Sequence, residues 1–176
     1  MTGMQRTSVD VLRDAIAMEM DGKEFFERAS GMMTRKRSRD MFVSLASQEK
    51  RHIDVLGHQL GLLGKGLDWA TLEDARRASG SSSRHSVFAD TGIRHLKLKP
   101  DAGELDVVDL GIDVEKRSIE YYRTAGQQMD DANARQVFNW LVGEESGHLI
   151  ILQAERDSRS GSGFYYGNME FSLETE

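Results

Sequence analysis

The sequence contains no cysteine, a single proline and no long apolar run among its 176 residues. Without cysteine, the chain has no disulfide, no thiolate zinc site, no iron–sulfur cluster and no cysteine nucleophile. No apolar stretch approaches the ~18 residues of a membrane-spanning helix. The N-terminal stretch MTGMQRTSV also lacks the apolar region of a secretory signal. We therefore expect a cytoplasmic protein with no membrane partner.

The charge of the chain also limits its partners. Its formal net charge is -6, and its largest basic cluster is Arg35-Lys36-Arg37, whereas nucleic-acid binding needs an extensive basic surface. A content of 39% hydrophobic and 30% charged residues is typical of a soluble globular protein. We expect no nucleic-acid partner. Because a chain of this length can bury one good core, we also expect a single domain over residues 1–176.

The scarcity of proline leaves long periodic stretches without helix breakers, which favours an all-α fold. The apolar spacing predicts four long helices, which cover about residues 8–33, 36–63, 101–129 and 131–158. The third helix should begin at Asp101, because Asp101 and Glu104 have the spacing of a capping box. The first two helices would form hairpin one, about 8–63, and the last two hairpin two, about 101–158.

A long crossover, about residues 64–100, separates the two predicted hairpins. It contains the polar stretch SGSSSRHS, and its pattern allows one short helix near residues 71–77. Connections of this length are uncommon unless they cross a bundle or have a function. The tail, residues 159–176, loses the helical period. We expect the tail to lie against the body of the protein or against a partner.

The two predicted hairpins are repeats of one another. When the sequence is shifted by 96 residues, Ala15–Leu56 aligns with Gly111–Leu152 without a gap. Of the 42 aligned positions, 11 are identical. This level of identity indicates that the chain is a duplicated helical hairpin.

In each hairpin, the helices carry a stripe of apolar residues at helical spacing, and acidic and imidazole side chains interrupt this stripe. In the second helix of each hairpin a Glu-x-x-His motif lies on the stripe, formed by Glu49 with His52 and by Glu145 with His148. Residues three apart on a helix are neighbours on one face, so each pair converges on one point. One helix earlier, a single glutamate interrupts the stripe at an equivalent position. The six candidate site residues are Glu19, Glu49, His52, Glu115, Glu145 and His148.

The chemistry of these six residues predicts a metal site. Four carboxylates in a core would repel one another and lose their hydration. Two divalent cations would neutralise these charges, and neutral imidazole nitrogens would complete the ligand sets. A single Glu-x-x-His motif is a weak signal, but two at equivalent places of a repeat are specific. We expect no role in the site for His58, His85 or His95, which have no such neighbours.

One glutamate from each of two helices, with Glu-x-x-His from the other two, is the arrangement of ferritin-like di-iron proteins. The stretches AIAMEMDGKEFFERAS and MFVSLASQEKRHIDVL, repeated as GIDVEKRSIEYYRTAG and VFNWLVGEESGHLIIL, resemble the rubrerythrin-like branch of that superfamily. The resemblance implies a ferritin-like four-helix bundle of two hairpins, with a long crossover between its second and third helices. It also implies two bound iron ions, although a manganese or mixed pair would suit the same ligands.

The resemblance also implies a role for each of the six residues. Glu49 and Glu145 would bridge the two metals. The remaining residues would each complete the ligands of one metal, Glu19 with His52 and Glu115 with His148. Rubrerythrins carry an additional carboxylate one turn after the glutamate of the third helix, where this sequence has Ser118. The redox-linked ligand exchange of rubrerythrins is therefore not carried over to this chain.

Four neighbouring residues carry separate expectations. Gln48 and Glu144 each precede a bridging candidate, so each is a candidate to orient the histidine of the opposite hairpin. For Tyr121 and Tyr122 we favour core packing with an exposed hydroxyl over a hydroxyl that reaches the metals.

The resemblance implies a non-haem di-iron oxidoreductase that reduces hydrogen peroxide to water. Rubrerythrins receive electrons from a cysteine-ligated rubredoxin iron, so this cysteine-free chain would need an external donor, such as a separate electron-donor protein. One alternative is a ferroxidase of the iron-handling or storage class that uses dioxygen, although the long crossover and irregular tail do not suit a cage-forming subunit. Another is a binding module with structural metals. We expect a homodimer.

Overall fold

The computed structural model describes residues 6–79, 98–99 and 101–160. Within these residues the secondary structure is entirely helical, which confirms the all-α prediction. None of the described helices is long and apolar enough to cross a membrane. The five helices are α1 (Ser8–Met32), α2 (Lys36–Leu63), α3 (Leu72–Ser79), α4 (Glu104–Gln128) and α5 (Ala132–Ser160).

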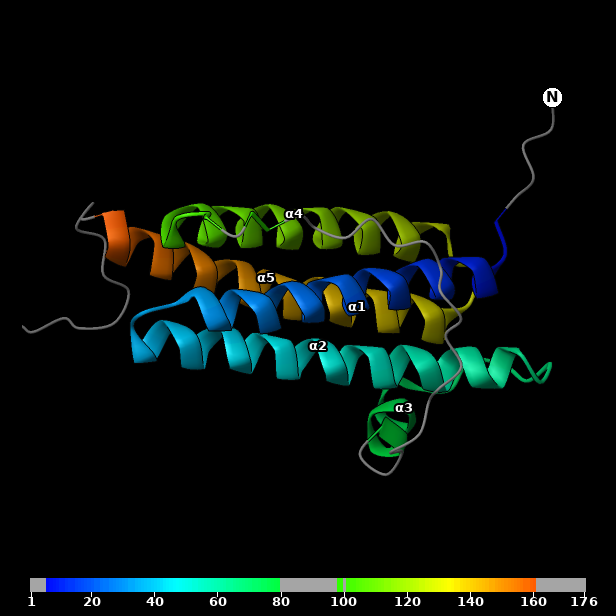
Figure 1. Ribbon diagram of the computed structural model, residues 1–176. Helices are drawn as coiled ribbons and strands as arrows, with labels where there is room; N and C mark the ends of the chain where they lie inside the picture. The colour runs from blue at the N-terminus through cyan, green and yellow to red at the C-terminus, as the bar shows by residue number, and fades with distance from the viewer. Residues whose placement is uncertain (1–5, 80–97, 100, 161–176) are drawn as a thin grey trace, which may run out of the picture.

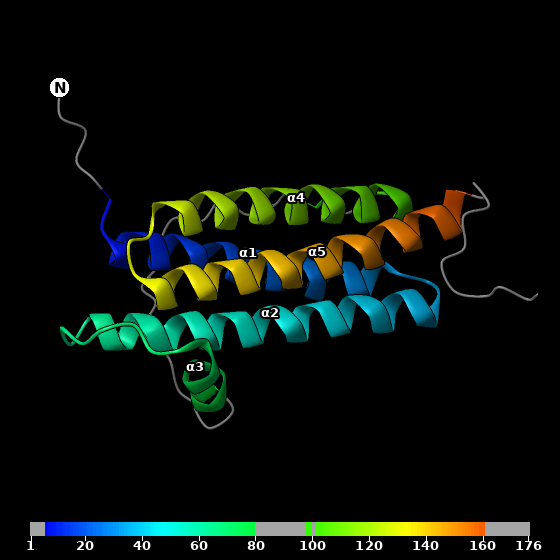
Figure 2. The same ribbon diagram turned by 180° about the vertical axis from the view of Figure 1, so that it is seen from behind.

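The four long helices form a bundle of two hairpins (Figure 1). α1 packs along α2, and α4 packs along α5. Between the hairpins, α1 contacts α4 and α2 contacts α5, so each helix has two neighbours in the bundle. The view from behind shows α5 in front, above α2, with α1 beyond it (Figure 2). This is the predicted four-helix bundle, and its inner faces surround one shared core.

The two hairpins turn in the same way, as expected of a repeat. Met33 caps the end of α1 and Met129 caps the end of α4, and these two cap residues have nearly the same backbone angles. Arg39 donates a hydrogen bond of 3.0 Å to the carbonyl of Met33, and Arg135 donates one of 2.9 Å to the carbonyl of Met129. Each arginine therefore satisfies a backbone carbonyl at the end of the preceding helix.

The start of α4 differs from the prediction. The helix begins at Glu104 rather than at Asp101, and its N-cap residue is Gly103. The acidic partner of the cap is Asp106, which accepts a hydrogen bond of 3.2 Å from the backbone N–H of Gly103. Asp106 lies three residues after the cap, where a carboxylate can satisfy a free N–H and complement the helix dipole. The predicted cap at Asp101 was therefore wrong.

The core consists of two apolar clusters with a polar layer between them. One cluster contains Leu12, Leu56 and Phe138, and the other contains Phe26 and Phe42, with further residues of all four long helices in both. Along each long helix, the predicted site residues lie between a residue of one cluster and a residue of the other. We call these six residues the central polar layer: Glu19, Glu49, His52, Glu115, Glu145 and His148.

The described part of the crossover is fastened to the bundle. After α2, Gly66 adopts a left-handed backbone with φ 73°, a conformation that favours glycine. The buried Gln59 side chain then donates to the carbonyl of Ala70 at 3.0 Å and accepts from its N–H at 2.9 Å. α3 follows, close to its predicted position, and lies across α2 (Figure 1). Most of residues 80–100 and the tail after Ser160 lie outside the described residues.

Candidate metal centre

The six predicted site residues lie together at the middle of the bundle. α1 and α4 each contribute one glutamate, and α2 and α5 each contribute a Glu-x-x-His pair. None of the six is more than 3% exposed. The apolar period of each helix turns these side chains inward, and the equal spacing within the repeat brings them to the same level.

Three carboxylates surround the Nδ1 atom of His52. Oxygen atoms of Glu19, Glu49 and Glu145 lie 3.2, 3.3 and 3.2 Å from it. A protonated Nδ1 carries one hydrogen, which cannot serve three acceptors at once. A cation at the point where these atoms converge would contact all of them.

A second set of three carboxylates surrounds Nδ1 of His148. Its distances to Glu49, Glu115 and Glu145 are 3.0, 3.3 and 2.9 Å. Glu49 directs Oε1 toward His148 and Oε2 toward His52, and Glu145 directs Oε2 toward His148 and Oε1 toward His52. Glu49 and Glu145 thus belong to both sets, while Glu19 and Glu115 each belong to one.

The protonation of the central polar layer reflects crowded negative charge. Burial, together with the charges of Glu145 and Glu49, raises the pKa of Glu19 well above its ordinary value. Burial likewise raises the pKa of Glu115. Against the effect of burial, the adjacent carboxylates of Glu115, Glu145 and Glu49 raise the pKa of His148 to about 12. Without metal, the layer therefore holds protons that bound cations would displace.

The donor atoms also fit metal ions, because several of them lack hydrogen-bond partners and because their spacing suits metal coordination. Within the described residues, the buried polar side-chain atoms that lack a hydrogen-bond partner all belong to this layer, on Glu49, His52, Glu115, Glu145 and His148. Two ligands bound about 2.1 Å from a metal at right angles lie about 3.0 Å apart, close to the separations above. Each set also brings one ligand atom from each of four residues within 4.8 Å of the others. The residues fit a site for two metal ions.

Tyr122 also reaches the central polar layer, contrary to the prediction that its hydroxyl would be exposed. The side chain is fully buried, and its hydroxyl donates a hydrogen bond to Oε1 of Glu19. Tyr121 does stay away from the layer, because its hydroxyl donates to the carbonyl of Val11 at 2.9 Å. Adjacent residues on a helix point about 100° apart, so only Tyr122 faces inward.

Glu144 lies beside His52, as predicted, and Trp140 holds it there. Glu144 Oε2 is 3.7 Å from Nε2 of His52, while Glu144 Oε1 accepts a hydrogen bond of 3.0 Å from the Trp140 indole. The Trp140 ring also lies edge-on to the His52 ring, with centroids 5.3 Å apart. Sequence analysis did not single out Trp140, although its position one helical turn before Glu144 was an available signal.

Gln48 does not orient His148, so this prediction was wrong. Its amide donates to the carbonyl of Ser44 on its own helix, at 3.4 Å. Nε2 of His148 has no hydrogen-bond partner among the described residues. The other histidines do not join the layer: His58 lies on α2 outside both ligand sets. His85 and His95 are outside the described residues.

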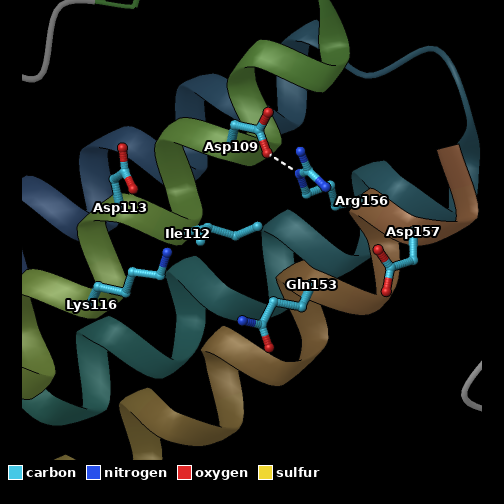
Figure 3. A pocket seen from close by; sticks show the side chains of 7 residues that line it. All are labelled: Asp109, Ile112, Asp113, Lys116, Gln153, Arg156 and Asp157. Carbon is cyan, nitrogen blue, oxygen red and sulfur yellow. Dashed lines mark hydrogen bonds and ion pairs between the residues drawn. The ribbon is translucent and has the colours of Figure 1, made fainter. Parts of the chain in front are cut away.

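A separate groove lies on the surface between α4 and α5 (Figure 3). It has a volume of about 570 Å³, and Asp109 on α4 forms an ion pair with Arg156 on α5 at its edge. Its lining carries charges of both signs and contains none of the six residues of the central polar layer. The groove is therefore distinct from the candidate metal centre.

Two solved structures resemble this fold. One is a hypothetical protein from Pyrococcus furiosus, with 18% sequence identity and a TM-score of 0.66, and the match covers 90% of this chain and 94% of that chain. The other is an uncharacterized conserved protein from Magnetospirillum magnetotacticum, with 20% identity and a TM-score of 0.57, covering 87% of this chain and 95% of that chain. At these identities the likeness supports the fold alone.

The family of this chain is identified by comparison of its sequence. A comparison with curated proteins gave no match. The family model for rubrerythrin, in contrast, matches residues 10–156. This range spans both hairpins and all six residues of the central polar layer. The chain therefore belongs to the rubrerythrin family.

Proposed function

We propose that this protein is a non-haem di-iron oxidoreductase that reduces hydrogen peroxide to water with electrons from an external donor. The observation that carries the proposal is the sharing of Glu49 and Glu145 between two ligand sets. Two metals held by Glu49 and Glu145 in common would be neighbours, so both could act on one small substrate. In this proposal Glu19 with His52 completes one metal site, and Glu115 with His148 completes the other.

Iron is the metal that suits this reaction. Two ferrous ions supply two electrons, and hydrogen peroxide takes up these electrons and two protons to form two molecules of water. Carboxylate and imidazole ligands bind iron, and they also bind manganese, so a manganese or mixed pair is the variant of the proposal that metal analysis tests.

The residues around the centre position the ligands and exclude bulk water. The two apolar clusters close the layer on both sides along the bundle. Tyr122 holds one oxygen of Glu19, which leaves the other directed toward His52. Glu144, whose side chain is 36% exposed, connects His52 with the surface. In the proposal, this side of the cluster is where small solutes approach the centre.

The electrons must come from outside this sequence, because a chain without cysteine cannot hold a rubredoxin-type iron. We propose a separate electron-donor protein as the partner, and a homodimer as the assembly. Neither nucleic acid nor a membrane has a part in the proposed reaction.

Metal content and oxidation kinetics test this function. The purified protein should contain about two irons per chain, as the two ligand sets require. The anaerobically reduced protein would then be mixed in a stopped-flow instrument with hydrogen peroxide or with dioxygen, and oxidation followed by absorbance. The proposal requires much faster oxidation by peroxide. The variant Glu49→Gln, which removes a shared charge, should lose both iron and the fast phase.

The same experiment identifies the alternatives. Faster oxidation by dioxygen, iron uptake beyond two per chain and a many-subunit particle in light scattering would indicate a ferroxidase of the storage class. A metal-loaded protein that reacts with neither oxidant would indicate structural metals. Either result would overturn the proposed peroxidase function.

A further inference from the structure

The repeat allows the surroundings of the two histidines to be compared position by position. His52 and His148 are equivalent in the alignment of the two hairpins. The residues around them are not. On the side of His52 the residues are Glu144, Trp140 and Tyr122. At the equivalent positions on the side of His148 the sequence has Gln48, Ser44 and Phe26, in the same order.

On the His52 side, every one of these residues supports a ligand. The carboxylate of Glu144 faces Nε2 of His52 at 3.7 Å, and Trp140 fixes that carboxylate with a hydrogen bond of 3.0 Å. Tyr122 donates to Oε1 of Glu19. Both terminal ligands of this position are thereby oriented before any metal arrives.

On the His148 side, the corresponding support is missing. The neutral amide of Gln48 donates to its own helix, so Gln48 does not give His148 a carboxylate like the one that lies 3.7 Å from Nε2 of His52. Phe26 has no hydroxyl, so it cannot donate to Glu115 as Tyr122 donates to Glu19. His148 and Glu115 are therefore less constrained than their counterparts.

A carboxylate behind a ligating histidine strengthens the metal–ligand bond. It accepts the N–H of the ring nitrogen that does not bind metal, which fixes the tautomer and makes the ligating nitrogen more basic. Loss of such a partner typically weakens metal binding by about 10–100-fold. Glu144 can provide this effect for His52, whereas Gln48 is uncharged and turned away from His148.

We infer that the two metal positions are inequivalent, with the ion at Glu19 and His52 bound first and about 10–100-fold more tightly than the ion at Glu115 and His148. The inference rests on the proposed di-metal site. It adds that the centre fills in a fixed order and that the second ion exchanges more readily. A mixed pair can then be assembled by supplying two metals in sequence.

Stepwise metal titration tests the inference without any measurement of turnover. Metal-free protein would be titrated with Co²⁺ under anaerobic conditions, with calorimetry for affinity and visible absorbance for the coordination of each ion. The expected result is two binding steps that differ about 10–100-fold in dissociation constant. A chelator should then remove one equivalent of Co²⁺ before the other.

Two reciprocal substitutions assign the steps. Glu144→Gln makes the His52 side resemble the His148 side, so it should weaken the tight step and bring the two dissociation constants together. Gln48→Glu supplies the missing carboxylate to His148, so it should tighten the weak step. Glu115→Gln should abolish the weak step and leave the tight one.

The control for Gln48→Glu is Ser47→Glu, which adds the same charge on the next residue. Ser47 lines a surface groove with Lys23 and Glu27, on the side of α2 that faces α1. Ser47→Glu should leave the ratio of the two dissociation constants unchanged. Helical circular dichroism would establish that every variant is folded.

The outcomes separate the inference from the function on which it rests. Two Co²⁺ ions bound with equal affinity, or a Glu144→Gln variant that weakens only the second step, would overturn the inference and leave the di-metal site standing. A protein that binds no Co²⁺ would overturn both.

Discussion

The hydroxyl of Tyr122 donates a hydrogen bond to the carboxylate of Glu19, which lies 103 residues away in the sequence. The contact joins α4 of one hairpin to α1 of the other, inside the bundle. It satisfies a buried phenol and a buried carboxylate at once. The hairpin interface and the candidate metal centre are therefore coupled through this pair.

Substitution of Tyr122 tests this coupling. Tyr122→Phe copies the residue of the equivalent position, Phe26, and leaves Oε1 of Glu19 without its donor. We expect the free energy of unfolding of the metal-free protein to fall by about 1–3 kcal/mol, the cost of an unsatisfied buried polar group. Urea denaturation in the presence of a chelator measures this change.

Tyr121→Phe is the control, because Tyr121 bonds to the carbonyl of Val11 rather than to a ligand. It should lower the free energy of unfolding by about 0.5–1.5 kcal/mol and leave Co²⁺ binding unchanged. Equal effects of the two substitutions on metal affinity would contradict the assigned role of Tyr122.

Metal should stabilise the folded protein, because the ligands converge only in the bundle. At a free metal concentration of 100 times the dissociation constant, one site should add about 2.7 kcal/mol to the free energy of unfolding. Thermal unfolding with metal and with a chelator measures the difference. Glu19→Gln should abolish much of this gain.

Glu19→Gln also tests the protonation of Glu19 in the metal-free protein. Because burial and neighbouring charges raise the pKa of Glu19 well above its ordinary value, its carboxyl group is already favoured in the neutral form in metal-free protein. Glu19→Gln should therefore change the metal-free stability little. A large loss of stability in the presence of a chelator would count against a protonated Glu19.

Acid should weaken a polar contact at one end of the bundle. Glu104 accepts hydrogen bonds from the hydroxyl and N–H of Thr34 and from Arg159, which lower its pKa from 4.5 to about 2. Because folding lowers this pKa, the contacts of the ionised Glu104 stabilise the folded protein above pH 4.5. This contribution is lost as the pH falls toward 2. Glu104→Gln should remove it.

Chemical denaturation at two pH values measures the contribution of Glu104. At pH near 6 the variant should be less stable than the natural sequence by about 1.5–3 kcal/mol, the range for hydrogen bonds to a charged group. Near pH 2 the difference should shrink. Glu120→Gln, at an exposed residue paired with Arg123, is the control and should cost less than about 1 kcal/mol at either pH.

The crossover should depend on Gln59 for its attachment. Gln59→Leu keeps the size of the buried side chain but leaves the N–H and carbonyl of Ala70 without their partners. We expect a loss of about 1–3 kcal/mol in the free energy of unfolding and faster hydrogen exchange at the Ala70 amide. Gln153→Leu, at an exposed position in the α4–α5 groove, should show neither effect.

Much of the fold and the candidate site could be predicted because both follow from periodicity. The apolar spacing locates four helices, and it also shows that Glu49 and Glu145 face inward. Because the same pattern occurs in both hairpins, the prediction that Glu19 lies in the site supports the same prediction for Glu115. Neighbours within one helix are set by the geometry of that helix, and no knowledge of the remaining chain is needed.

Contacts between helices depend on how each helix is rotated and shifted against its neighbour, and periodicity does not specify either one to within the length of a hydrogen bond. For this reason the inward hydroxyl of Tyr122 and the failure of Gln48 to reach His148 emerged only from the packed bundle. The start of α4 was missed for a related reason: Asp101 with Glu104 and Gly103 with Asp106 have the same three-residue spacing, and the sequence does not show which pair caps the helix. Sequence periodicity thus identifies which residues meet in the core, and the packing of the hairpins determines which of their atoms touch.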